Sequence, residues 1–153
     1  MGLEVTGLVD RPHEYDFSDL AALPDQIADV SQLAPGREGA AVRLATVLSA
    51  VKPRPEARYI TLQAEGGYSA SVPLDAVADH AVILYTLDGE PLPAKLGGPL
   101  RFLIPDVAAC QTAEVDSCAS VKYLRRIVIS AERGKDTRPR TLREHTVLHA
   151  ERP

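Results

Sequence analysis

Residues 57–104 constrain the fold more than any other part of the chain, because short apolar runs alternate there with strong turn signals. The runs on either side of Glu65-Gly66-Gly67 predict a β-hairpin, since glycine permits the positive φ of a tight turn. A later apolar run ends at Asp88-Gly89, a second turn of this kind. Strands are therefore expected at 59–62, 68–72, 82–87 and 100–104. Many short strands with few helices indicate an α+β domain rather than a doubly wound α/β domain.

The rest of the chain supplies two helices and further strands. Apolar residues recur at helical spacing over 44–51, which predicts a helix there. Ser18 suits the N-cap of a short helix that stops near Pro24. Residues 107–119 read as a loop. The remaining strands are expected at 3–9, 13–17, 27–33 and 126–130.

The length of 153 residues allows one domain with a sizeable core. We expect this domain to span residues 1–131, with residues 132–153 as a polar, basic C-terminal extension that either docks on it or trails from it. No apolar run approaches the ~18 residues that cross a bilayer. Acidic residues come too early for a signal peptide, so a cytoplasmic protein with no membrane partner is expected.

Charge is distributed unevenly along the chain. Residues 1–120 hold 8 Lys and Arg against 17 Asp and Glu, whereas residues 121–153 hold 9 against 4. A basic end can meet an anionic ligand or a partner, but a solvated surface that offsets the acidic body explains it more simply. Aromatic residues make up 5% and are not interleaved with the basic ones, so nucleic acid is not an expected partner.

The two cysteines, Cys110 and Cys118, have a separation that fits neither a CxxC redox pair nor a standard zinc site. Buried, reduced thiols are expected in a cytosolic protein, and a disulfide if the chain is exported. His145 and His149 stand four residues apart, but no glutamate follows His145. They therefore indicate a surface pair rather than a zinc-protease helix. No metal site is predicted from these spacings.

Five motifs follow one another in a characteristic order. They are EGGY (65–68), VPLDAV (72–77), DGEPL (88–92), GGPLRFLIP (97–105) and SVKYLRRI (120–127). Each is weak alone, but their joint order and spacing resemble the molybdopterin-binding domain of sulfite-oxidase-type oxidoreductases. The resemblance covers residues 3–131. It implies a sulfite-oxidase-like α+β fold with short strands in mixed sheets, and molybdopterin, the organic part of the molybdenum cofactor, as ligand.

The resemblance also implies a cofactor site. Arg101 and Lys122 match basic positions that lie near the pterin and its phosphate in the family. A planar guanidinium and a lysine point charge suit such a phosphorylated heterocycle. Ser117 and Ser120 precede Lys122 in a loop that offers hydroxyl and backbone donors to a phosphate. The other candidate cofactor-binding residues are Gly67, Tyr68, Asp29 and Ser31.

Two departures from the family pattern bear on catalysis. Family enzymes bind molybdenum through a cysteine thiolate, a soft ligand. Alignment on residues 44–48 places Asp29, or one of the two residues after it, at that position. Where the family usually has a histidine before the paired glycines, this chain has Leu96. Cys110 or Cys118 is a less favoured substitute, because a metal ligand depends on neighbours that fix its geometry.

Three functional hypotheses remain open. The first is a molybdopterin-dependent oxidoreductase that transfers an oxygen atom or reduces an oxide, with the cofactor carrying the difficult step. The second is a non-catalytic module on the same fold that recognises another anionic ligand or a protein partner, and the missing thiolate favours it. The third is a subunit that works only in a homo-oligomer, with the basic tail as a docking arm.

Overall fold

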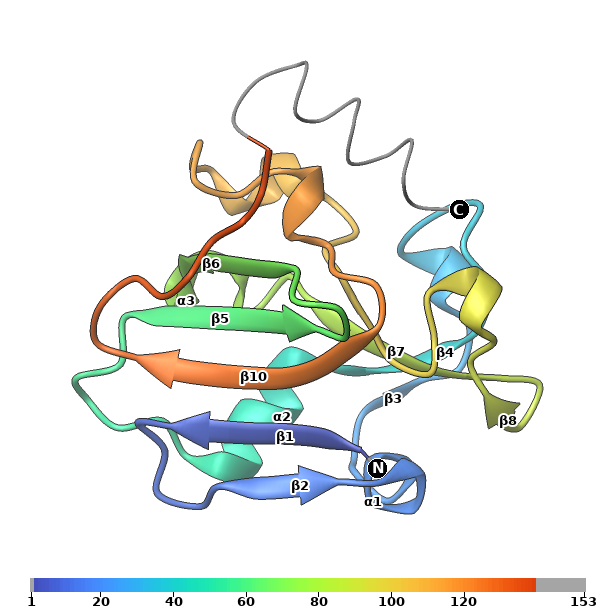
Figure 1. The fold of residues 1–153 in the computed structure, drawn as a ribbon. Coiled ribbons are helices and arrows are strands. Elements are labelled where there is room, and N and C mark those ends of the chain that lie inside the picture. The colour runs from blue at the N-terminus through green and yellow to red at the C-terminus, as the bar shows by residue number, and fades with distance from the viewer. Residues whose placement is uncertain (1, 140–153) are drawn as a thin grey trace.

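Two five-stranded β-sheets and three short α-helices build the part of the chain that the computed structural model describes, residues 2–139 (Figure 1). The first sheet has the strand order β2-β1-β10-β5-β6; the second has β3-β4-β7-β8, with β9 also paired to β7. The strands of the first sheet are β1 (Leu3–Gly7), β2 (His13–Tyr15), β5 (Tyr59–Ala64), β6 (Ser69–Pro73) and β10 (Leu124–Ser130). The strands of the second sheet are β3 (Gln26–Ile27), β4 (Ala40–Arg43), β7 (Val82–Leu87), β8 (Glu90–Pro91) and β9 (Arg101–Leu103). The helices are α1 (Phe17–Ala21), α2 (Leu44–Val51) and α3 (Leu74–Val77), with 3-10 helices η1 (Val30–Gln32), η2 (Ala94–Leu96), η3 (Val107–Cys110) and η4 (Ser117–Ala119). The predicted α+β class is confirmed.

The hairpin predicted around residues 65–67 is formed by β5 and β6. Tyr59 pairs with Pro73 at one end of the ladder, and Gln63 pairs with Ser69 at the other. Gly67, in the turn between the strands, has a φ of 95°. Glycine adopts this left-handed conformation without the strain that a side chain would bring, so the turn depends on it.

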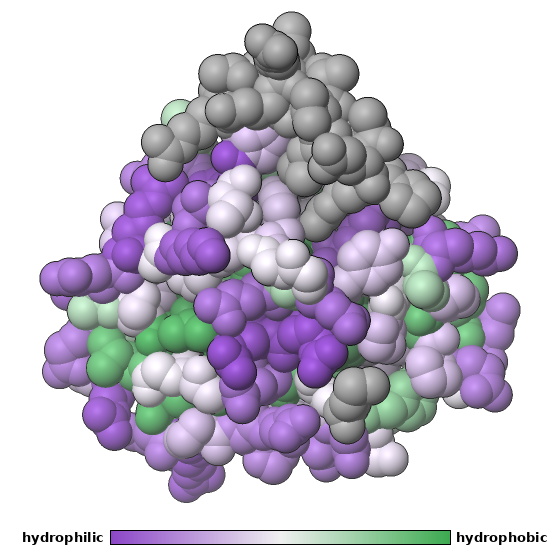
Figure 2. Space-filling model, viewed as in Figure 1, coloured by the Kyte–Doolittle hydropathy of each residue, from purple (hydrophilic) through white to green (hydrophobic). Residues whose placement is uncertain are grey.

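The first and last strands of the described chain meet in the middle of the first sheet. β1 runs parallel to β10, with Val5 opposite Ile127, whereas every other strand pairing within residues 2–139 is antiparallel. Both side chains are fully buried. Figure 2 shows hydrophilic side chains gathered near the middle of the face that this sheet presents to the viewer, and Glu4 and Arg126 form an ion pair on the same two strands. The sheet therefore has one apolar and one polar face.

The second sheet is apolar on both faces. Successive side chains of a strand point to opposite sides, so β7 contributes Ile83 and Tyr85 to the main core and Val82 and Leu84 to a smaller one. The main core also contains the buried residues of α2, which lies behind β1 and β10 in Figure 1. The smaller core includes Val30 from η1. This double burial explains the continuous apolar run at 82–87.

Two local predictions were wrong. The strand expected at 27–33 stops at Ile27, because Asp29 caps η1 by accepting a hydrogen bond from the Ser31 backbone N–H. Such side-chain-to-backbone bonds compete with strand pairing. The short helix after β2 is capped by Asp16 rather than Ser18, through a reciprocal pair of bonds with Asp19. The helix predicted at 44–51 is confirmed by α2.

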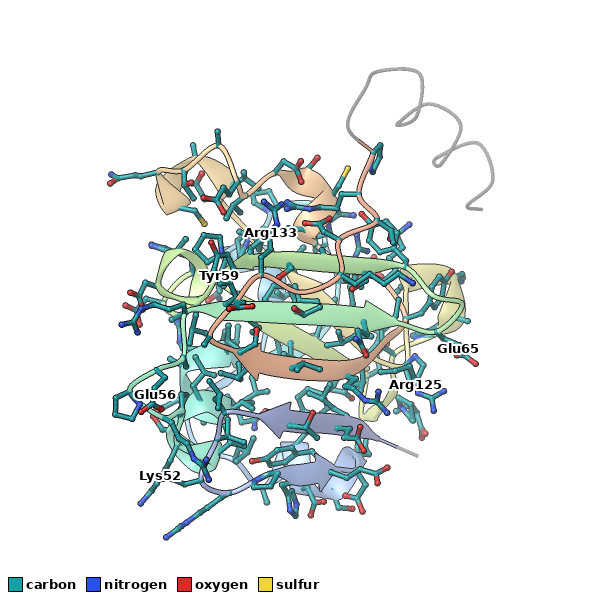
Figure 3. All side chains as sticks on the ribbon, turned by 60° about the vertical axis from the view of Figure 1, so that its left-hand side comes forward. Lys52, Glu56, Tyr59, Glu65, Arg125 and Arg133 are labelled. Atoms are coloured by element: carbon teal, nitrogen blue, oxygen red, sulfur yellow. The ribbon has the colours of Figure 1, made fainter. Side chains whose placement is uncertain are left out.

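Residues 131–139, called the strap below, cross the outer edge of β6. The Thr137 N–H donates to the Ser69 carbonyl at 2.7 Å, and the Gly134 N–H donates to the Ser71 hydroxyl at 2.9 Å. Figure 3 shows Arg133 beside this edge, and Glu65 and Arg125 together at one end of the sheet. The start of the predicted extension thus contacts the domain, while residues 140–153, with His145 and His149, lie outside the described residues. None of the helices within residues 2–139 has the length and apolar character needed to cross a membrane.

Candidate anion-binding site

A hollow of about 500 Å³ lies where the turn after η1, the strand β9 and the segment after η3 meet. Its polar lining consists of Arg37, Arg101, Ser117, Ser120 and Lys122. Three of these side chains are basic and two carry hydroxyls, and no acidic residue belongs to the lining. The hollow is therefore suited to an anionic, hydrogen-bonding ligand.

Arg101 is the buried cation of this site. It is 8% exposed, and its Nη1 donates to the Leu96 carbonyl at 3.3 Å. Its Nε is the one buried side-chain nitrogen or oxygen among residues 2–139 that lacks a hydrogen-bond partner. Burial lowers the pKa of Arg101, and the nearby charge of Arg37 lowers it further. A buried donor without a partner is costly to the fold, so this arrangement favours binding of an anion.

The paired glycines bring Arg101 and Lys122 together. Gly97 has a φ of 93°, and a Cβ there would lie 2.9 Å from Lys122 Cγ and 3.1 Å from Arg101 Cδ. At Gly98 a Cβ would clash with the backbone carbonyl of Leu92. The absence of a side chain at Gly97 thus leaves room for the side-chain carbons of Arg101 and Lys122, and its absence at Gly98 leaves room for the backbone of Leu92.

The site loop, residues 111–122, is bonded directly to β9. Phe102 and Val121 exchange two backbone hydrogen bonds of 2.8 Å. The Ser120 hydroxyl accepts a bond from the Ile104 N–H at 3.0 Å, so part of its capacity is already used. Asp116 caps η4 by accepting from the Cys118 N–H at 3.0 Å, which fixes Ser117 at the start of that turn. The GGPLR and SVKY motifs therefore form a single structural unit.

Four other predicted site residues do not line the hollow. Asp29 is exposed and accepts bonds from the Ser31 N–H at 3.0 Å and from its hydroxyl at 2.6 Å; these bonds lower the pKa of the carboxyl. Gly67 lies in the exposed β5–β6 turn. The Tyr68 hydroxyl donates to the Cys118 carbonyl at 2.7 Å, so Tyr68 contacts the site loop rather than the hollow. Direct binding of the cofactor by these residues remains a prediction.

Arg37 was missed from the sequence. It follows Ala34-Pro35-Gly36, which reads as an ordinary turn, and the segment before it was predicted to be a strand. In the structure the turn returns from η1 toward β4 and carries Arg37 into the lining. The available signal was the presence of a basic residue, Arg37, a few positions after the expected metal-ligand position at Asp29.

The two cysteines are close in sequence to residues that line the hollow, but neither cysteine belongs to the lining. Cys110 ends η3 and Cys118 lies within η4, and both are buried free thiols. Burial raises the pKa of the Cys110 thiol, and the charge of Asp106 raises it further. Across residues 2–139 no three His, Cys, Asp or Glu side chains cluster as a metal site would require. The polar lining thus fits the phosphate of a pterin, but it offers no thiolate to a metal.

Comparison with known proteins agrees with this fold. The family model described as the oxidoreductase molybdopterin-binding domain matches residues 39–137. An uncharacterized oxidoreductase of Bacillus subtilis, YuiH, is 31% identical over 139 residues, which is 85% of this chain and 65% of the relative. A nitrate reductase [NADPH] of Fusarium oxysporum is 29% identical over 99 residues, covering 60% of this chain and 10% of the relative. The chain thus spans less than two thirds of each of these relatives.

Among solved structures, the sulfane dehydrogenase SoxCD from Paracoccus pantotrophus has the same fold. The TM-score is 0.63 at 21% identity, and the match covers 86% of this chain and 38% of that chain. The two-sheet α+β architecture and the family-model match together define a domain of the molybdopterin-binding type. The chain belongs to the oxidoreductase molybdopterin-binding domain family, as its match over residues 39–137 establishes.

Proposed function

We propose that this domain binds the phosphate-bearing pterin of the molybdenum cofactor in the hollow around Arg101. The observation that carries the proposal is the buried, unpartnered Nε of Arg101. A phosphate bound beside the Arg101 guanidinium would neutralise a cation that burial disfavours and that lacks a partner at Nε. Arg37 and Lys122 would add charge, and the Ser117 hydroxyl would add a donor.

The cofactor, when bound, supplies the two-electron chemistry of oxygen-atom transfer. This chain would hold and orient it through the phosphate, with Arg101 as the main anchor. The hollow offers no thiolate to the molybdenum, because residues 1–109 contain no cysteine and neither Cys110 nor Cys118 lines the hollow. Catalysis would require cofactor binding first. Catalysis, a substrate and an electron-transfer partner are therefore part of this proposal.

A second candidate function rests on that same absence. A non-catalytic module would use the three basic side chains for another phosphorylated or anionic small molecule, and would need no thiolate. Oligomerisation or a protein partner would then give the domain its role. Both candidates share the anion site and differ in whether a metal is bound.

The experiment is to purify the protein from a host that makes molybdopterin and to measure pterin fluorescence after oxidation, together with elemental molybdenum. We expect about one pterin per chain for a single site. Arg101→Met and Arg37→Gln should lower the pterin content. Arg54→Gln is the matched control, because Arg54 is exposed and pairs with Asp10 at 3.2 Å outside the hollow.

The outcomes separate the candidates. Pterin with molybdenum supports the oxidoreductase. Pterin or phosphate binding without metal supports the non-catalytic module. A wild-type protein that carries no pterin from a competent host, and that does not bind inorganic phosphate in a titration, would refute the anion site altogether.

A further inference from the structure

The strap is joined to the site loop by one buried arginine. The Arg138 side chain is 8% exposed, and the hydrogen bonds that fix it come from three separate parts of the chain. Its Nη2 donates to the Ser71 carbonyl of β6 at 3.2 Å. Its Nη1 donates to the Glu114 carbonyl at 2.8 Å and to Asp116 Oδ1 at 3.3 Å. Arg138 thus connects an edge strand, the strap and the site loop.

Asp136 holds this guanidinium in place. Arg138 Nη2 donates to Asp136 Oδ2 at 2.6 Å, and Nε donates to Oδ1 at 2.9 Å. The Asp136 carboxylate also accepts from the Ser71 N–H at 3.2 Å and from the Arg138 N–H at 3.1 Å. A bidentate pair of this kind restricts both side chains to one geometry. The pair therefore acts as a rigid bracket rather than as a loose surface contact.

The bracket reaches the anion site through a single carboxylate. Asp116 Oδ1 accepts from Arg138 and also from the Cys118 N–H, the bond that caps η4. η4 begins with Ser117, which lines the hollow. The strap covers the edge of β6 without the bonds from Arg138 Nη1, because Gly134 and Thr137 already bond Ser71 and Ser69, respectively. The contacts of Nη1 consequently serve the loop and not the edge.

We propose that Asp136 and Arg138 are positioning residues that hold the site loop so that Ser117 and Lys122 face the hollow. This inference rests on the proposed anion-binding function, since positioning matters only if the hollow takes a ligand. Neither residue lines the hollow. Their effect on binding is indirect, through the order of the loop.

The test combines hydrogen exchange with ligand binding. Arg138→Met keeps most of the apolar stem and removes the charge. In the protein without ligand, we expect the Cys118, Ala119 and Ser120 amides to exchange about tenfold faster or more, since hydrogen bonds to charged groups are worth roughly that factor. The amides between β5 and β10 should keep their rates. Binding of inorganic phosphate and retention of pterin should fall by a similar factor.

Three further variants separate positioning from general damage. Arg133→Gln is the matched control, because Arg133 also lies on the strap and, within residues 2–139, its side chain donates to Asp136 alone, at 3.1 Å. It should change loop exchange less than about twofold. Arg138→Lys should restore part of both effects by keeping the charge. After Asp116→Asn, the further change Arg138→Met should add less than it does alone, because the two residues share one contact.

The outcomes are distinct for the bracket and for the site. Unchanged loop exchange in Arg138→Met, or faster exchange with unchanged phosphate and pterin binding, would overturn the positioning role. Failure of the wild-type protein to bind either probe would instead refute the proposed function, and with it the significance of the bracket for binding.

Discussion

Replacing Arg101 by methionine should stabilise the fold while it removes the ligand. The wild-type side chain keeps a buried Nε without a partner, and such a group costs about 1–3 kcal/mol. The change also loses the bond from the charged Nη1 to the Leu96 carbonyl, whose length of 3.3 Å weakens it below the ~1.5–3 kcal/mol usual for a charged donor, to about 1 kcal/mol. Leu96 is only partly buried, so water can replace that donor. The expected net gain is about 1 kcal/mol.

Urea unfolding of both proteins in phosphate-free buffer measures this difference directly. In a thermal unfolding experiment, a gain of about 1 kcal/mol would raise Tm by about 2–4 °C for a domain of this length. Arg54→Gln, which alters an exposed ion pair, should change stability by less than about 0.5 kcal/mol and serves as the control. If Arg101→Met lowers the free energy of unfolding by more than about 1 kcal/mol, Arg101 is a structural residue and the argument for a ligand at its guanidinium fails.

Three other predictions follow from the packing. Gly97→Ala should cost about 1–2 kcal/mol in urea unfolding, because it places a Cβ at a φ of 93° against Lys122, and phosphate binding should weaken with it. Phe102→Ala, which empties a fully buried position, should cost about 3–5 kcal/mol by the same assay. For Asp136, burial alone would raise the pKa, but the bonds from Arg138 and Arg133 outweigh it and hold the pKa well below its usual range. Its stabilising contribution is therefore complete above the unfolded pKa, about 4, and is lost as the pH falls below it; thermal unfolding from pH 7 to pH 3 should show a smaller decline for Asp136→Asn than for wild type.

Sequence patterns were sufficient where local chemistry and tertiary structure agree. The hairpin at 59–73 and the helix at 44–51 follow from glycine turns and from apolar spacing, which the surrounding structure reinforces. Arg101 and Lys122 were identified by motif, and the structure brings both into one hollow. The strand expected at 27–33 failed because one carboxylate, Asp29, offers the backbone a competing bond.

Long-range side-chain contacts could not be predicted from the sequence. Arg37 enters the site because of the path of a turn, which no local pattern specifies. The bonds of Arg138 join residues 22 and 67 positions away in the chain, and a single basic residue in a polar tail gives no sign of them. Burial of such a residue is decided only when the tail crosses β6.

The parallel pairing of β1 with β10 has a consequence for how the protein is made. Glu4 and Arg126, which lie opposite each other in this pairing, are separated by 122 positions in the chain. During synthesis the first strand must therefore wait for nearly all the described residues before its neighbour exists. Contacts that close such long loops form slowly, and unpaired strand edges invite association with other chains. Within the described residues, β1 is thus synthesised early but is among the last strands to gain its full set of neighbours, and chaperone demand should be greatest just before residues 124–130 appear.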